Sequence, residues 1–192
     1  IFSEIYVTSE NDEIITISEN SDAKTIHRPE ELSTNTSMEI DAYTHALQRI
    51  KESMGALPKY FCTPYATAIL LKPEDFIKSY NALRNNRHEP DVLMSVSHYD
   101  VHPYKAMQKN SDGYLQMLHP KECLQRSQTY PEYLASNGTF SWLKTEPFLK
   151  NPTYYPEKLD GYILPKDRAI DIDKPADLTL ATALKQLQLN EK

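Results

Sequence analysis

The sequence contains little glycine and cysteine and no long hydrophobic run. Its four glycines lie far apart in 192 residues, and none belongs to a Gly-rich phosphate loop of the P-loop or dinucleotide type. Cys62 and Cys123 fit neither a disulfide framework nor a CxxC metal site, so we expect a reducing, cytoplasmic location. No apolar run approaches the ~20 residues of a membrane span, and no signal-peptide pattern is visible.

Positive charge is also in short supply. The chain has 21 Lys and Arg residues against 27 Asp and Glu residues, a net charge of −6. This acidity argues against nucleic acid or an anionic membrane as the main partner, although it leaves room for a local basic pocket. The GxSxG and HExxH motifs are absent, so the sequence gives no support to a serine hydrolase or a zinc hydrolase.

Short apolar strands alternate with amphipathic helices along most of the chain. Strands are predicted at 4–9, 25–28, 59–63, 92–96, 139–143 and 161–164, and longer helices at 37–54, 73–83 and 175–189. The acidic run at 11–13 is suited to cap a short helix after the first strand. The alternation predicts an α/β, Rossmann-like fold, with a mostly parallel sheet covered by helices on both faces.

Residues 98–118 break this alternation. They predict two antiparallel strands around the turn at 110–113, a hairpin that we expect to make a subunit contact. His98, Asp100 and His102 have a spacing usable for a metal, but Pro103 follows at once and the segment lies in the hairpin. A structural role for these histidines is therefore favoured.

Two carboxylates stand two residues apart near the C-terminal end, at Asp171 and Asp173, where a strand is predicted to run into a helix. Side chains at i and i+2 of a strand share one face, so both can converge on a hard cation such as Mg²⁺. The alternative is a surface Asp171 and an Asp173 that only caps the helix begun by Pro175. Arg28 and Arg126 can each fork onto a phosphate or carboxylate, or each can be a solvated surface residue.

Taken in order, eight segments resemble the acylneuraminate cytidylyltransferase (CMP-sialic acid synthetase) family. They are EIYVTSENDEI (4–14), HRPEELSTNT (27–36), IDAYTHAL (40–47), YATA (65–68), HPYKAM (102–107), RSQ (126–128), NGTFSW (137–142) and LPKDRAIDIDKPADL (164–178). The resemblance covers nearly the whole chain, so residues 1–192 are interpreted as one domain. YATA and RSQ are most similar to the pseudaminic acid branch, whereas Asn137-Gly138 is more similar to the sialic acid branch.

This resemblance implies a nucleotidyltransferase of bacterial surface-glycan biosynthesis. The anomeric hydroxyl of a nine-carbon 2-keto sugar acid attacks the α-phosphorus of CTP and releases pyrophosphate, with Mg²⁺ as the cofactor. A homodimer formed through the extension at 98–125 is implied, with neither nucleic acid nor a membrane as partner. The implied site comprises catalytic and metal-binding Asp171 and Asp173, catalytic Arg126, nucleotide-side Ser9, Glu10 and Arg28, and sugar-side Tyr65, Thr67, Arg126, Gln128 and Phe140.

The chain also departs from the family pattern. The first strand and an Arg/Lys-rich, RxGSKR-like phosphate loop are expected before Ile1, Gln108 matches a usual lysine, Tyr65 a usual glutamine, and Ile69 a usual proline. These departures leave two alternatives open. One is a non-catalytic homologue that dimerises or binds a ligand, and the other is a sister enzyme that uses a shorter keto-sugar acid.

Overall fold

The computed structural model describes residues 1–190, which fall into two compact units. Unit 1 comprises Ile1–Thr63, Phe76–Leu93 and Ser141–Asp160, and unit 2 comprises Pro64–Asp75, Met94–Phe140 and the chain from Gly161 onward. The chain therefore passes from one unit to the other five times. Among residues 1–190, no helix is long and apolar enough to cross a membrane.

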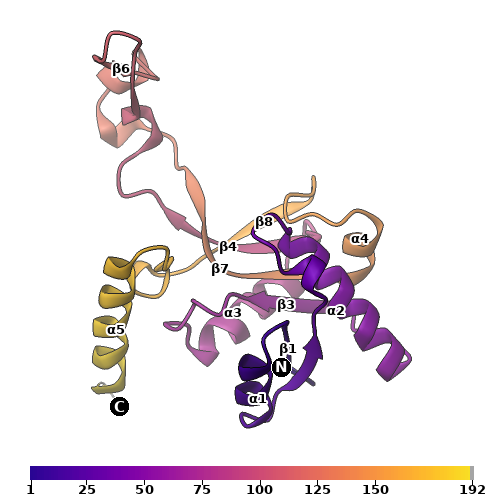
Figure 1. Ribbon diagram of the computed structural model, residues 1–192. Coiled ribbons are helices and arrows are strands. Elements are labelled where there is room, and N and C mark those ends of the chain that lie inside the picture. The colour runs from indigo at the N-terminus through magenta and orange to yellow at the C-terminus, as the bar shows by residue number, and fades with distance from the viewer. Residues whose placement is uncertain (191–192) are drawn as a thin grey trace. The chain divides into compact units, whose positions relative to one another are not determined.

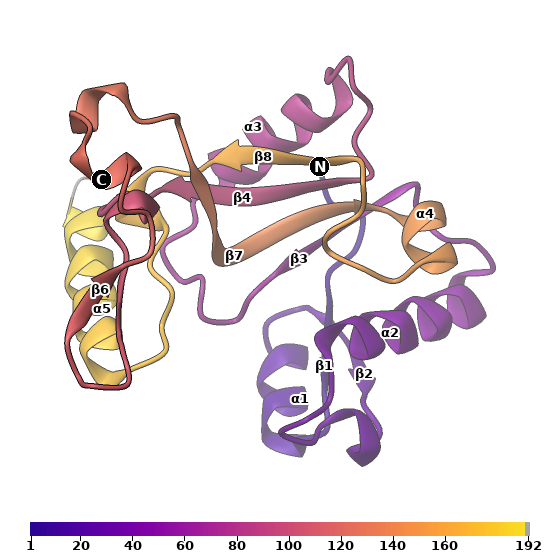
Figure 2. The ribbon, with the colours of Figure 1, turned by 90° about the horizontal axis from the view of Figure 1, so that it is seen from above.

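Unit 1 begins with a parallel pair of strands, β1 (Tyr6–Ser9) and β2 (Lys24–His27), connected by the helix α1 (Asp12–Glu19) (Figure 2). The Asn11 side chain caps α1, because its Oδ1 accepts hydrogen bonds from the backbone N–H groups of Glu13 (2.8 Å) and Ile14 (3.1 Å). The predicted strands and the capped helix between them are confirmed.

Unit 1 also contains further helices and a buried tryptophan. The predicted amphipathic helix is α2 (Glu39–Met54), and it ends where predicted, at Gly55 with φ 73°. A short helix that we did not predict, α4 (Thr145–Lys150), spans only six residues, too few for a helical period to stand out. Trp142 lies at the centre of the unit 1 core. Its ring stacks on Phe2 at 5.4 Å, and its indole N–H donates to Ser79 Oγ at 2.9 Å.

Four strands pair into one sheet, with the order β3-β7-β4-β8. Its strands are β3 (Tyr60–Pro64), β4 (Val92–His98), β7 (Leu134–Lys144) and β8 (Leu159–Ile163), and the helix α3 (Pro73–Arg84) connects β3 to β4 (Figure 1). All four strands and α3 were predicted, although β7 is longer than expected. The mixed α/β class is confirmed.

Strand β7 differs from the mostly parallel sheet that we expected. As the residue numbers along β7 rise, the numbers of the residues bonded to it in β3 and β4 fall, so β7 is antiparallel to both of these strands. Strand β8 is parallel to β4. The bonds that fix these directions are Tyr65 N to Thr139 O (2.9 Å), Thr145 N to Lys59 O (3.0 Å), Phe140 N to Ser95 Oγ (3.1 Å), Lys144 N to Asp91 O (2.9 Å), Asp91 N to Lys158 O (2.8 Å) and Leu164 N to Val96 O (2.9 Å). The chain returns from β4 to β7 without a crossover helix, which is why β7 is reversed.

The return from β4 to β7, residues 99–133, lies in unit 2 and contains most of the extension predicted at 98–125; we call this whole return the extension. The strands β5 (Met107–Lys109) and β6 (Leu115–Met117) pair antiparallel around a turn containing Gly113, whose φ is 86°. At its base, His102 packs against Tyr104 and Tyr130 at 4.7 Å each and against Tyr133 at 4.9 Å. Short 3-10 turns occur at Pro103–Lys105, Glu122–Leu124 and Ser127–Thr129, and elsewhere at Glu30–Leu32 and Lys166–Arg168.

The last helix, α5 (Pro175–Asn190), is held to the loop after β3. Lys185 Nζ donates to the Ile69 carbonyl at 2.8 Å, and Gln188 Nε2 donates to the Leu70 carbonyl at 3.2 Å. The strand predicted immediately before this helix is wrong. Residues 169–173 are irregular and follow the 3-10 turn at Lys166–Arg168.

Candidate active site

The ten predicted site residues are divided between the two units. Ser9, Glu10 and Arg28 lie in unit 1, at the ends of β1 and β2. The other seven lie in unit 2: Tyr65, Thr67, Arg126, Gln128, Phe140, Asp171 and Asp173. We therefore describe two groups of residues, one in each unit.

In unit 1, Arg28 is already engaged by its neighbours. Its Nη2 lies 2.6 Å from Glu10 Oε2, and its Nε donates to Ser33 Oγ at 2.9 Å. The hydrogen bond from Arg28 lowers the pKa of the Glu10 carboxyl. Ser9 is buried, and its Oγ accepts from the backbone N–H of Asn11 at 3.1 Å. Arg28 is thus held in place and partly neutralised, while Ser9 shapes the turn into α1.

In unit 2, the Asp171 carboxylate lies against the backbone of β7 at Gly138. A Cβ at Gly138 would lie 2.7 Å from Asp171 Oδ2 and 3.0 Å from Oδ1. The carboxylate therefore occupies the space that any other side chain at 138 would need. This close approach joins two of the segments that carry the family resemblance, residues 137–142 and 164–178.

Further carboxylates surround Asp171. Partial burial, followed by the charges of Asp173 and Asp177, raises the pKa of the Asp171 carboxyl. Asp171 and Asp173 are exposed, so the cluster is open to an incoming ligand. Such a gathering of negative charge suits a divalent cation. Within residues 1–190, no group of three His, Cys, Asp or Glu side chains is placed to hold a metal ion by itself.

The helix cap that was the alternative role for Asp173 belongs to Asp177 instead. Asp177 Oδ2 accepts from the backbone N–H of Lys174 at 2.8 Å and of Asp173 at 3.2 Å, which satisfies donors at the start of α5. The strand geometry used to pair Asp171 with Asp173 is wrong, because both lie in the irregular segment 169–173. Their proximity comes from the tight loop that leads into the helix.

A buried polar network underlies Gly138, and sequence reasoning missed it. The Ser95 hydroxyl donates to Asn137 Oδ1 at 2.7 Å, and the Thr139 hydroxyl donates to the same oxygen at 2.8 Å. Asn137 Nδ2 in turn donates to Ser97 Oγ at 2.9 Å. Because Asn137 and Thr139 flank Gly138, these bonds fix its backbone. The Asn-Gly pair was noticed only as a marker of family branch.

A buried ion pair anchors the segment before Asp171. Arg168 Nε lies 2.9 Å from Asp75 Oδ2, and the Asp75 side chain is only 2% exposed. Asp75 also accepts from the backbone N–H of Lys72 at 2.9 Å. Removing one partner of such a pair leaves a buried charge without compensation, so loss of either side chain should destabilise this segment.

Tyr65 and Thr67 lie in the loop after β3, as predicted. Tyr65 N donates to the Thr139 carbonyl at 2.9 Å, which brings this loop to β7 one residue from Gly138. Thr67 is exposed, and its carbonyl accepts from Ile69 N at 2.8 Å. The loop is therefore placed beside β7, with the Thr67 side chain open to solvent.

Phe140 is a poor candidate for a substrate contact. Its side chain is 1% exposed and packs 6.2 Å from the Tyr162 ring. The alternation of faces along β7 turns Phe140 into the core. We therefore withdraw Phe140 from the substrate-binding set and assign it a packing role.

Arg126 and Gln128 are exposed in the extension, at the 3-10 turn Ser127–Thr129. The Arg126 carbonyl accepts from Thr129 N (2.9 Å) and Thr129 Oγ1 (2.8 Å), which fixes its backbone. Among residues 1–190, its guanidinium has no ion-pair partner. Arg126 therefore presents a cation that is available to an anionic ligand.

The histidines of the same extension have structural partners, as favoured from the sequence. His102 Nε2 lies 3.0 Å from the Pro131 carbonyl, and its Nδ1 accepts from Tyr104 N at 3.2 Å. His98 Nδ1 lies 3.4 Å from Glu132 Oε1.

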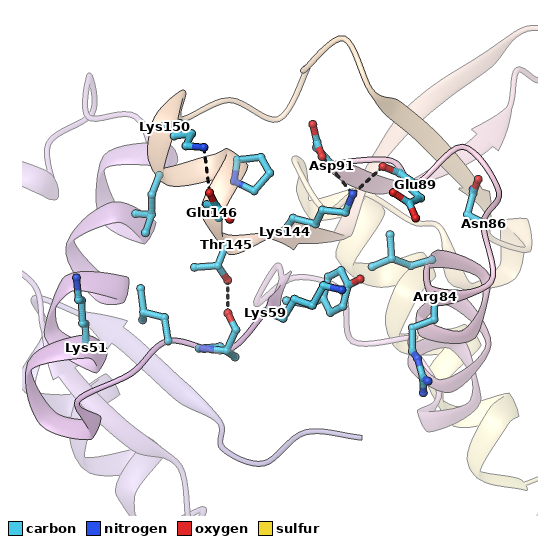
Figure 3. A pocket seen from close by; sticks show the side chains of 16 residues that line it. Lys51, Lys59, Arg84, Asn86, Glu89, Asp91, Lys144, Thr145, Glu146 and Lys150 are labelled. Carbon is cyan, nitrogen blue, oxygen red and sulfur yellow. Dashed lines mark hydrogen bonds and ion pairs between the residues drawn. The ribbon is translucent and has the colours of Figure 1, made fainter.

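A cavity of about 820 Å³ lies in unit 1, and none of the ten predicted residues lines it (Figure 3). Figure 3 shows the Lys144 ammonium between Asp91 and Glu89; Nζ lies 3.3 Å from Asp91 Oδ1 and 2.7 Å from the Glu89 carbonyl. Lys150 pairs with Glu146 at 2.9 Å. Lys144 and Lys150 are thus paired with carboxylates of the same cavity, and because no predicted site residue lines it, we do not interpret it as the catalytic site.

Comparisons with known proteins agree with the family resemblance of the sequence. No family model matches the chain. Over 185 residues it is 25% identical to a pseudaminic acid cytidylyltransferase of Campylobacter jejuni subsp. jejuni serotype O:23/36, covering 96% of this chain and 78% of the relative. These relatives support the acylneuraminate cytidylyltransferase family that the sequence resembles. A second relative with the same name, from C. jejuni serotype O:2, is 24% identical to this chain over the same coverage.

The fold of this chain also matches a solved structure. That structure is CMP:2-keto-3-deoxy-manno-octonic acid synthetase complexed with CTP, with a TM-score of 0.63 and 13% sequence identity. The match covers 97% of this chain and 82% of the other. At this identity the likeness concerns the fold, and it confirms the predicted nucleotidyltransferase architecture.

Proposed function

We propose that this protein is a cytidylyltransferase that transfers CMP from CTP to a nonulosonic acid of the pseudaminic or sialic type. The observation that carries the proposal is the exposed carboxylate cluster of Asp171 and Asp173 beside Gly138. It lies in a chain whose relatives are named pseudaminic acid cytidylyltransferases. The anomeric oxygen forms a bond to the α-phosphorus, the bond to pyrophosphate breaks, and the hydroxyl proton is lost.

Asp171 and Asp173 would hold Mg²⁺ in this proposal. The cation usually binds one or two carboxylates together with substrate phosphates and water, so two carboxylates without a third protein ligand fit it. When bound, Mg²⁺ neutralises the triphosphate and can lower the pKa of the attacking hydroxyl. The two aspartates supply fixed negative charge at the end of a loop that Arg168 and α5 hold in position.

Arg126 is assigned to the sugar acid. Its guanidinium, which has no ion-pair partner among residues 1–190, can make a forked contact with the carboxylate that every 2-keto sugar acid carries. Gln128, two residues further on, can hydrogen-bond the hydroxyls or amides of the sugar. Thr67 and the loop at Tyr65 complete the sugar side of the proposal.

A homodimer formed through the extension is part of the proposal. The extension presents large apolar side chains to solvent, with Tyr114 74% and Leu124 86% exposed and Leu115 and Leu118 also exposed. Exposed apolar groups of this kind often mark an interface with another protein. A reducing, cytoplasmic location also remains part of it, and Cys62 and Cys123 are both free thiols.

The proposed function can be tested by pyrophosphate release from CTP in the full-length protein. We expect release only when Mg²⁺ and a nine-carbon nonulosonic acid are both present, with the CMP-sugar identified by mass spectrometry. Faster release with the eight-carbon 2-keto-3-deoxy-manno-octonic acid would identify the sister enzyme. A protein that shows neither turnover nor a CTP-dependent thermal shift would be the non-catalytic homologue.

The Glu10–Arg28 pair gives a prediction for nucleotide binding. Glu10→Gln keeps a hydrogen-bond acceptor for Arg28 but removes the negative charge, so we expect the Kd for CTP to fall about two- to fivefold, the range of an exposed ion pair. Isothermal titration calorimetry at low salt measures this change. Glu52→Gln, which breaks the exposed pair of Arg49 in α2, is the matched control and should leave the Kd unchanged. A weaker affinity for CTP in Glu10→Gln would mean that Glu10 itself binds the nucleotide.

A further inference from the structure

We propose that Gly138 is a positioning residue for the metal-binding carboxylate of Asp171. This inference rests on the proposed function, because it concerns how the proposed Mg²⁺ ligand is placed. Gly138 itself has no functional group. Its contribution is the bare Cα surface on which the Asp171 carboxylate lies.

The close approach at Gly138 is specific among the glycines with positive φ. Gly138 has φ 60°, Gly55 has 73° and Gly113 has 86°. A Cβ at Gly55 or Gly113 would meet nothing within 4 Å, whereas at Gly138 it would lie 2.7 to 3.0 Å from three atoms of the Asp171 carboxyl group. Real Cβ atoms do not approach other heavy atoms this closely, so a methyl group here must displace its neighbour.

The two sides of the contact differ in how easily they can move. On the β7 side, Asn137 and Thr139 are buried and share a network with Ser95, so the backbone of Gly138 is held firmly. On the other side stands an exposed aspartate in an irregular loop. A methyl group at 138 would therefore move the carboxylate and leave the strand in place.

Movement of the carboxylate matters more to metal binding than to folding. Metal sites tolerate only small displacements of their ligands, because coordination distances and directions are fixed. The Asp171 side chain can rotate away from a methyl group into solvent at little cost. The structure therefore predicts a variant that folds but binds the cation poorly.

Gly113→Ala is the control for Gly138→Ala. It also places an alanine at a positive φ, but its Cβ would meet no other atom within 4 Å. Both variants should lose thermal stability to a similar extent, roughly 2–4 °C in Tm, because alanine is strained at positive φ. Mn²⁺ serves as the probe for the cation, and its binding is followed by electron paramagnetic resonance in the presence of CTP. We expect the Mn²⁺ Kd to rise at least tenfold in Gly138→Ala and to be unchanged in Gly113→Ala.

Equal Mn²⁺ affinity in the two variants would overturn the proposal. Should Gly138→Ala fail to fold, the double variant Gly138→Ala with Asp171→Ala should fold, because the methyl group then meets no carboxylate; a double variant that also fails to fold would overturn it as well. If the wild-type protein bound no Mn²⁺, the proposed metal site would fail. Crystal structures of the variants then decide the role of Gly138, since the Asp171 carboxylate should be displaced in Gly138→Ala and in its wild-type position in Gly113→Ala.

Discussion

Asp173→Asn should lower the rate of pyrophosphate release about 100- to 1,000-fold while leaving the Tm unchanged. The amide keeps the size of the side chain but removes the charge that would hold Mg²⁺, and a metal ion contributes several kcal/mol to the stabilisation of transition-state charge. Asp173 is exposed, and its backbone N–H, which bonds to Asp177, is kept in the variant. Steady-state kinetics over a range of Mg²⁺ concentrations, together with thermal unfolding, measures both effects.

Asp177→Ala is the matched control for this prediction. It removes the acceptor at the start of α5, so it should cost about 1 kcal/mol of unfolding free energy, the typical loss of a helix cap, and lower turnover much less than Asp173→Asn, because Asp177 is not a proposed metal ligand. Asp173→Asn should thus affect mainly turnover, and Asp177→Ala mainly stability. Unchanged turnover in Asp173→Asn would remove this residue from the mechanism.

Arg126→Ala should raise the KM for the sugar acid about 10- to 150-fold and leave the Kd for CTP unchanged. A hydrogen bond to a charged group contributes about 1.5–3 kcal/mol, which corresponds to this factor. The KM of Arg126→Lys should lie between those of Arg126→Ala and the wild type, because a lysine keeps the charge but cannot form the forked contact. Initial rates with varied sugar acid at saturating CTP distinguish the three proteins.

The control for Arg126 is another exposed arginine of the chain. Arg87, in the connection between α3 and β4, is exposed and matched no site residue of the family, so Arg87→Ala should leave both constants unchanged. An equal rise of KM in the two alanine variants would indicate a general effect of charge. No rise in Arg126→Ala would exclude its assignment to the sugar carboxylate.

Much of the fold could be predicted because local rules act within each element. The three- and four-residue spacing of apolar groups located α2, and Gly55 marked its end, since only a residue that tolerates positive φ fits there. The reversal of β7 could not be predicted in this way. Strand direction depends on how the chain returns from β4, a property of the tertiary structure that leaves no periodic signal.

The candidate site was predicted in part. The resemblance identified Asp171 and Asp173, but the strand geometry invoked to bring them together is wrong, and Asp177 caps the helix instead. Asp177 is the third residue of the helix that begins at Pro175, a position from which an acidic side chain can reach back to the N–H groups before the helix, and this position could have indicated that cap. The contact between Gly138 and the Asp171 carboxylate could not be predicted from sequence, because the two residues are more than 30 positions apart.

The extension at 99–133 begins after β4 and ends before β7, two neighbouring antiparallel strands of the sheet. Its two ends therefore lie close together, and the segment is an insertion between two neighbouring strands. Such an insertion can change in length and sequence at small cost to folding, because the closure entropy of a loop grows only slowly with its length. On the proposed function, the same segment carries Arg126, Gln128 and the dimer contact. Substitutions within this one insertion would then change the sugar-acid contacts and the dimer contact together. The proposed metal ligands, Asp171 and Asp173, lie outside it and would be unchanged.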